Sequence, residues 1–98
     1  MYIEPWSNIS EYPEGHIEAL ARELENELSE NHILYDLASK VLAKREDQDE
    51  ILVTNKLGYF IVHLTWSGKT EICPFPKFEK FETLEILKIK LAYDSELY

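Results

Sequence analysis

The sequence predicts an α+β fold: a small antiparallel sheet of three to four strands, joined as a meander, with an N-terminal helix and a C-terminal helix on one of its faces. Residues 58–71 give the clearest evidence for the sheet, because they form the longest apolar run and are rich in β-branched and aromatic residues. Residues 17–28 and 84–91 repeat apolar side chains every three or four positions, which is typical of helices that cover a sheet.

The composition predicts a single domain over residues 1–98. The 98 residues are 45% apolar, which is enough for one hydrophobic core without a metal or a disulfide. Cys73 is the single cysteine, so we expect a reducing environment and a cytoplasmic location. Residues 1–6 lack the basic and apolar segments of a signal peptide, and no apolar run approaches the roughly 20 residues that span a bilayer.

The N-terminal part should be an irregular arm followed by a helix. Residues 1–15 contain two prolines, and we expect Trp6 to anchor this arm by packing onto the domain. A helix is predicted over 15–29, because its apolar side chains share one face. Its charged side chains, Glu23 and Glu27 among them, are assigned to the solvent side.

Three antiparallel strands are expected next, over 37–45, 50–55 and 58–66, because short loops suffice to join them. The first is ambiguous, since the apolar residues of 33–45 also fit a helix, and both alternatives stay open. In the third strand, alternate side chains should reach opposite faces of the sheet. One face is expected to be wholly apolar, with Phe60, Val62, Leu64 and Trp66. The other face is expected to be mixed, with Tyr59, Ile61, His63 and Thr65.

The C-terminal third should end in a helix. We expect a short strand over 69–72 and an extended, proline-rich stretch over 74–76. A helix is predicted over 83–94 with Thr83 as its N-cap, although residues 87–93 also alternate as a strand would.

The net charge of −9 restricts the partners. A strongly acidic chain opposes binding to nucleic acid and to anionic membranes, where lysine and arginine supply the affinity. The same charge permits a basic protein partner, because an acidic surface attracts a cationic one. Solubility alone is the favoured explanation of this charge.

Two stretches carry a resemblance to known proteins. The first is Arg45-Glu46-Asp47-Gln48-Asp49-Glu50, and the second is His63-Leu64-Thr65-Trp66-Ser67-Gly68-Lys69. An Arg-x-Asp-x-Asp-Asp/Glu stretch followed by a His-Leu-Thr-Trp-Ser-Gly-Lys strand resembles a small, uncharacterised bacterial single-domain family, over roughly residues 24–94. The resemblance implies a strand over 38–45 and a helix over 83–94, and it implies no mechanism.

His63 and Glu71 are the candidate catalytic residues. As a general base, His63 would need a carboxylate partner such as Glu71, and the sequence does not fix that distance. A histidine among apolar strand residues is more often structural, so the sequence leans against an enzyme and indicates no cofactor. No metal site is expected, because the histidines lack zinc-ligand spacing and the acidic turn 47–50 lacks the glycine of a calcium loop.

Six residues are candidate binding residues: Arg45, Asp47, Asp49, His63, Trp66 and Lys69. Arg45 and the two aspartates would form either a recognition patch or a structural ion-pair cluster that shapes the turn, and the structural role is favoured.

The sequence therefore predicts a small, acidic, cytoplasmic bacterial protein that acts as a protein-interaction module. An immunity or antitoxin-like protein that neutralises a basic protein is one example of this class. The alternatives are a homodimeric structural module and a small ligand-binding protein or enzyme centred on His63.

Overall fold

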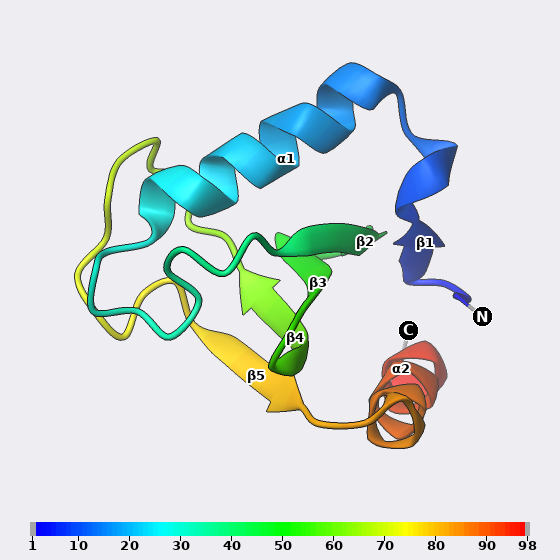
Figure 1. Cartoon of the computed structure of the whole chain (residues 1–98). Coiled ribbons are helices and arrows are strands. Elements are labelled where there is room, and N and C mark those ends of the chain that lie inside the picture. Colours follow the sequence, from blue (N-terminus) through cyan, green and yellow to red (C-terminus); the bar gives the residue numbers. More distant parts are fainter. Residues whose placement is uncertain (1, 98) are drawn as a thin grey trace.

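The computed structural model describes residues 2–97, which form a five-stranded antiparallel sheet with one helix on each face (Figure 1). The strands follow one another across the sheet in the order in which they occur in the chain. The elements are β1 (Trp6–Asn8), a 3-10 turn (Ile9–Glu11), α1 (Glu14–Glu27), β2 (Lys40–Arg45), β3 (Glu50–Asn55), β4 (Gly58–His63), β5 (Phe78–Phe81) and α2 (Leu84–Leu97).

The predicted α+β class, the antiparallel meander and the two terminal helices are confirmed. The sheet has five strands, so the prediction of three to four was too low. The two additional strands lie at the edges, where β1 pairs with β2 and β5 pairs with β4. Both are short and follow proline-containing segments, and each gains its backbone hydrogen bonds from the neighbouring strand.

The two helices cover opposite faces of the sheet, so their predicted placement on one face is wrong (Figure 1). The α1 side of the core contains Leu20, Leu24, Leu28, Leu34, Val41, Ile51, Val53, Phe60, Val62 and Leu64. The α2 side contains Trp6, Ala43, Leu52, Ile61, Phe81, Leu87 and Leu91. Because the central strands are apolar on both sides, each side requires its own cover.

The helix predicted over 15–29 is confirmed as α1, and Trp6 is buried as the expected anchor of the N-terminal arm. The arm is less irregular than expected, because it contains β1 and the 3-10 turn. The predicted solvent position of Glu23 and Glu27 is wrong, since both side chains are buried.

Residues 40–45 form a strand, so the helical alternative for 33–45 is wrong. The register of β2 against β3 shifts between Val41 and Ala43, which marks a β-bulge. The segment that leads into β2 contains Asp36 and Ala38 in the left-handed region, with φ of 59° and 51°.

The strand predicted over 58–66 ends at His63, and residues 69–72 form no strand. Its predicted apolar face is confirmed for Phe60, Val62 and Leu64, whereas Trp66 lies beyond the strand and is exposed. The strand ends because the amides of Thr65 and Trp66 donate to a glutamate of α1 and not to a neighbouring strand.

Neither of the two helices within residues 2–97 is both long and apolar enough to cross a membrane.

Candidate functional site

His63 lies in a groove of about 490 Å³ at the end of β4. The groove is lined by Glu50, Ile61, His63, Thr65, Phe75, Lys77, Phe78 and Glu79. Ile61 belongs to the α2 side of the sheet and His63 follows it by two residues, so the groove opens on that side. Its apolar and aromatic walls would accommodate a small ligand or one side chain of a partner.

The groove does not assemble a catalytic pair from the predicted residues. His63 is exposed over 53% of its side chain, and its Nδ1 lies 3.8 Å from Oε2 of Glu50. That distance exceeds a hydrogen bond, and Glu50 also accepts from Arg45. Glu71, the other candidate, accepts a hydrogen bond of 2.6 Å from the Thr65 hydroxyl, which with Ser67 holds the pKa of Glu71 below its ordinary value.

Arg45 lies at the centre of a largely buried ion-pair network. Its guanidinium contacts Asp47 at 2.6 Å, Glu50 at 3.3 Å and Asp94 at 3.4 Å. Asp94 lies on α2 and also accepts a hydrogen bond of 2.9 Å from Nε1 of Trp6. The network therefore joins three strands to α2, which favours a structural role for Arg45.

The other candidate binding residues do not gather at one place. Asp47 bonds to Arg45, which lowers the pKa of Asp47. The backbone carbonyl of Asp49 accepts from the Leu64 amide, and the Asp49 side chain is exposed. Trp66 and Lys69 are exposed on the connection between β4 and β5 and do not line the groove of His63.

Glu27 holds this connection against α1, a role that the sequence analysis missed. Its carboxylate is 0% exposed and accepts from the amides of Thr65 and Trp66 at 2.9 Å each. The neighbouring Glu23 accepts from the Gly68 amide at 3.1 Å. Burial and the contact with Glu23 raise the pKa of Glu27 to about 7, against the opposing effect of the two amides. The sequence offered one indication of this role: the two glutamates are four residues apart and lie next to the leucines on the buried side of the helix.

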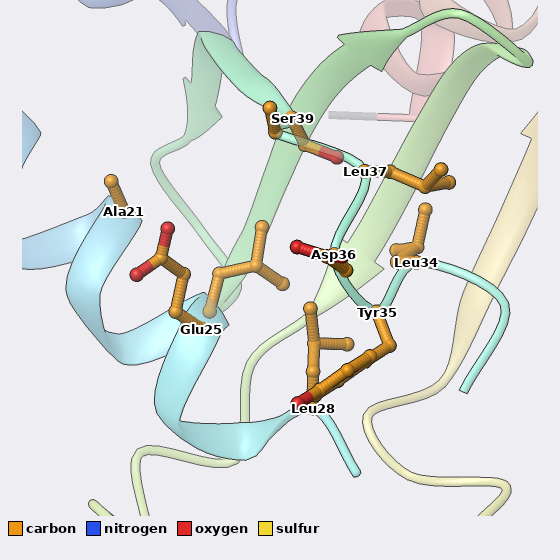
Figure 2. A pocket seen from close by; sticks show the side chains of 10 residues that line it. Ala21, Glu25, Leu28, Leu34, Tyr35, Asp36, Leu37 and Ser39 are labelled. Carbon is orange, nitrogen blue, oxygen red and sulfur yellow. The ribbon is translucent and has the colours of Figure 1, made fainter. Parts of the chain in front are cut away.

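A second cavity, of about 400 Å³, lies between α1 and the segment 34–39 (Figure 2). Its lining consists of Ala21, Leu24, Glu25, Leu28, Leu34, Tyr35, Asp36, Leu37, Ala38 and Ser39. Figure 2 shows the Asp36 carboxylate turned toward α1, where Glu25 lies on the facing wall. This cavity was also missed, because its two walls are separated in sequence by the helix end.

The outward face of α2 carries an exposed apolar stripe. The stripe consists of Ile86, Ile89, Tyr93 and Leu97, whose exposed fractions range from 49% to 71%. These residues are three or four positions apart and so lie along one side of the helix. The opposite side of α2 carries Leu87 and Leu91, which are buried against the sheet. The helix is thus apolar on two sides, and the sheet covers one of them.

Within residues 2–97, no group of three or more metal-ligating side chains lies close enough to hold an ion. No family model matches the chain, and neither the curated proteins nor the solved structures contain a match to it.

Proposed function

We propose that this chain is a protein-interaction module that binds a basic protein through the outward face of α2. The exposed stripe of Ile86, Ile89, Tyr93 and Leu97 carries the proposal. Isolated exposed apolar residues are ordinary, but a continuous apolar side of a helix is the usual form of a surface that meets a partner. Burying one large apolar side chain contributes about 1.5–3 kcal/mol, so the stripe would supply a substantial part of a binding energy.

Charges beside the stripe favour a basic partner. Glu85 and Glu96 lie on one flank, because the step of 11 residues from one to the other corresponds to about three helical turns. Neither forms an ion pair with another of the described residues. On the other flank, Lys90 is bonded to Asp94 at 2.8 Å and lies over the Tyr93 ring. The available charge at the stripe is therefore negative, as is the net charge of −9.

The homodimer alternative fits these charges less well. In a two-fold antiparallel pair of α2 helices, the same flank of each copy would meet, so Glu85 and Glu96 of both copies would approach one another. Like charges at such positions destabilise the pair. A partner with a lysine-rich or arginine-rich amphipathic helix would meet both the apolar stripe and its acidic flank. A toxin domain neutralised by an immunity or antitoxin-like protein is one class with this chemistry.

A second candidate function is the binding of a small ligand in the groove of His63. The buried Ile61 at its base and the aromatic rings of Phe75 and Phe78 favour this candidate. A ligand bound there should stabilise the fold against heat, and the His63→Ala variant should lose that stabilisation.

The proposal is tested by capturing partners from the native lysate with the tagged protein and with the Ile89→Glu/Tyr93→Glu variant. Both residues are exposed, so the variant should fold and its circular dichroism should match that of the parent chain. We expect the parent to retain one basic protein in stoichiometric amount and the variant to lose it. The control is Ile72→Glu, which adds one negative charge, where the α2 variant adds two, at an isoleucine that is 85% exposed on the β4–β5 connection.

Retention of the same partner by the α2 variant would overturn the proposal. Loss of the partner by Ile72→Glu and by the α2 variant alike would show that added negative charge, and not the stripe, is responsible. If His63→Ala alone abolished an interaction, the groove would replace α2 as the functional site.

A further inference from the structure

The cavity between α1 and the segment 34–39 has an apolar base. Leu24, Leu28 and Leu34 line it, and all three belong to the buried core on the α1 side of the sheet. Its volume of about 400 Å³ exceeds the space that one long side chain needs. An occupant would therefore place apolar atoms against these leucines.

The rim of the same cavity is suited to a positive charge. Glu25 on α1 and Asp36 on the facing segment are exposed carboxylates, and neither forms an ion pair with any of residues 2–97. Tyr35 adds an aromatic ring beside Leu28, as Figure 2 shows. The lining contains no lysine, arginine or histidine, so nothing within it neutralises the two carboxylates.

We propose that this cavity binds a lysine side chain of the basic partner. A lysine combines a four-carbon stem, which would pack on the leucines, with an ammonium group that donates in three directions. The carboxylates lie on opposite walls, so a compact ammonium would meet both, whereas the planar guanidinium of arginine suits a single carboxylate approached side-on. A bare metal ion would fit poorly, because it would leave the leucines in contact with water.

This inference rests on the proposed function only for the source of the lysine. The cavity lies on the α1 side of the sheet and the apolar stripe lies on α2, on the opposite face. A partner that used both would need to reach around the domain or to carry an extended segment. The two surfaces can therefore be tested independently.

The test is a nuclear magnetic resonance titration of the full ¹⁵N-labelled chain with N-acetyl-lysine-N-methylamide. We expect saturable shifts confined to the amides of residues 21–28 and 34–39, with a dissociation constant on the order of 1 mM, as is usual for so small a ligand. The uncharged analogue N-acetyl-norleucine-N-methylamide should bind about tenfold more weakly, because it lacks the ammonium.

Two variants and one competing ligand complete the test. The Glu25→Gln/Asp36→Asn double variant should remove the preference for the lysine probe, and asparagine is compatible with the positive φ of 59° at position 36. Unchanged shifts in this variant, or no saturable shifts in the parent, would overturn the proposal. Tighter binding of free 1,5-diaminopentane than of the lysine probe would assign the cavity to a small amine instead.

The Ile89→Glu/Tyr93→Glu variant separates this proposal from the proposed function. It should bind the lysine probe as the parent does, even though it should lose the captured partner. If the probe fails to bind while capture still depends on α2, the cavity assignment fails and the interaction module stands. If the probe binds while capture does not depend on α2, the interaction through α2 is contradicted and the cavity assignment stands.

Discussion

Asp94 links α2 to the sheet through buried polar contacts. It is almost fully buried and accepts from Trp6 and Lys90 while it faces the guanidinium of Arg45. A buried carboxylate with several charged and hydrogen-bonded partners is costly to remove, because its partners are then left buried without compensation.

We therefore predict that Asp94→Leu lowers the free energy of unfolding by about 3 kcal/mol, as measured by urea denaturation. Asp94→Asn should cost less, because the amide oxygen still accepts from Trp6 Nε1. The matched control is Asp47→Asn, which removes an exposed partner of the same Arg45 and should cost under about 1 kcal/mol. Equal losses for the Asp94 and Asp47 variants would contradict the central role of Asp94.

The backbone conformation of Ala38 lowers the stability of the fold. Its φ of 51° lies in the left-handed region, which an alanine rarely adopts because its Cβ is crowded by the backbone. Ala38→Gly should therefore raise the free energy of unfolding by about 0.5–1 kcal/mol in urea denaturation. Ala92→Gly on the exposed side of α2 is the control and should lower it by about 1 kcal/mol, as glycine does inside a helix. Destabilisation of both variants would contradict the prediction.

At the scale of elements, α1 holds the β4–β5 connection through its last two turns. The carboxylates of Glu23 and Glu27 accept from three backbone amides of that connection, and the Glu27 carbonyl accepts from a fourth, that of Glu71. The part of the connection over residues 65–71 is thereby held by α1, although those residues belong to no strand.

The burial of Glu27 beside Glu23 should make stability depend on pH. Folding raises the pKa of Glu27 from an ordinary value of 4.5 to about 7, so the folded chain binds this proton more tightly than the unfolded chain does. The resulting stabilisation is complete below about pH 4.5 and is lost as the pH rises through about 7.

We predict that Glu27→Gln removes this loss between pH 5 and pH 8, as measured by urea denaturation at each pH. Glu18→Gln, at an exposed position of the same helix, should keep the pH dependence of the parent chain. If Glu27→Gln and the parent lose stability equally over this range, the raised pKa is contradicted.

The elements themselves were predictable to different degrees. The helical spacing of Leu20, Leu24 and Leu28 identified α1, and the apolar run through Phe60 and Val62 identified β4. The edge strands were not predictable from four or fewer residues each, because their pairing depends on a neighbour that is distant in sequence. The end of β4 was misplaced for a similar reason, since the amides of Thr65 and Trp66 find their acceptor on α1.

At the scale of the whole molecule, the arrangement of three layers, a sheet between two helices, could not be predicted from the sequence. Polar residues such as His63 and Thr65 made one face of the sheet mixed, and both helices were assigned to one face, yet Leu52 and Ile61 on the mixed face are buried under α2. The apolar pattern of α2 was ambiguous because this helix has two apolar sides, which also made residues 87–93 resemble a strand. The Arg45 network joins residues that are far apart in the chain, from Trp6 to Asp94, so only the fold could assemble it.

The second apolar side of α2 leads to a prediction for the protein in solution. The stripe alone would favour self-association, whereas a net charge of −9 and the like-charged flanks of Glu85 and Glu96 oppose it. Charge should prevail at low ionic strength, where it is least screened. We therefore expect sedimentation equilibrium to give the mass of one chain at low salt. We expect weak dimerisation at about 1 M sodium chloride, where the screening length falls to about 3 Å.

Two variants identify the cause of that change. Glu85→Gln/Glu96→Gln should bring dimerisation to lower salt, because it removes the repulsion and leaves the stripe intact. Ile89→Glu/Tyr93→Glu should stay monomeric at every salt concentration, because it interrupts the stripe. A parent chain that is dimeric at low salt would contradict this balance, because the flanking carboxylates would then fail to keep two α2 helices apart.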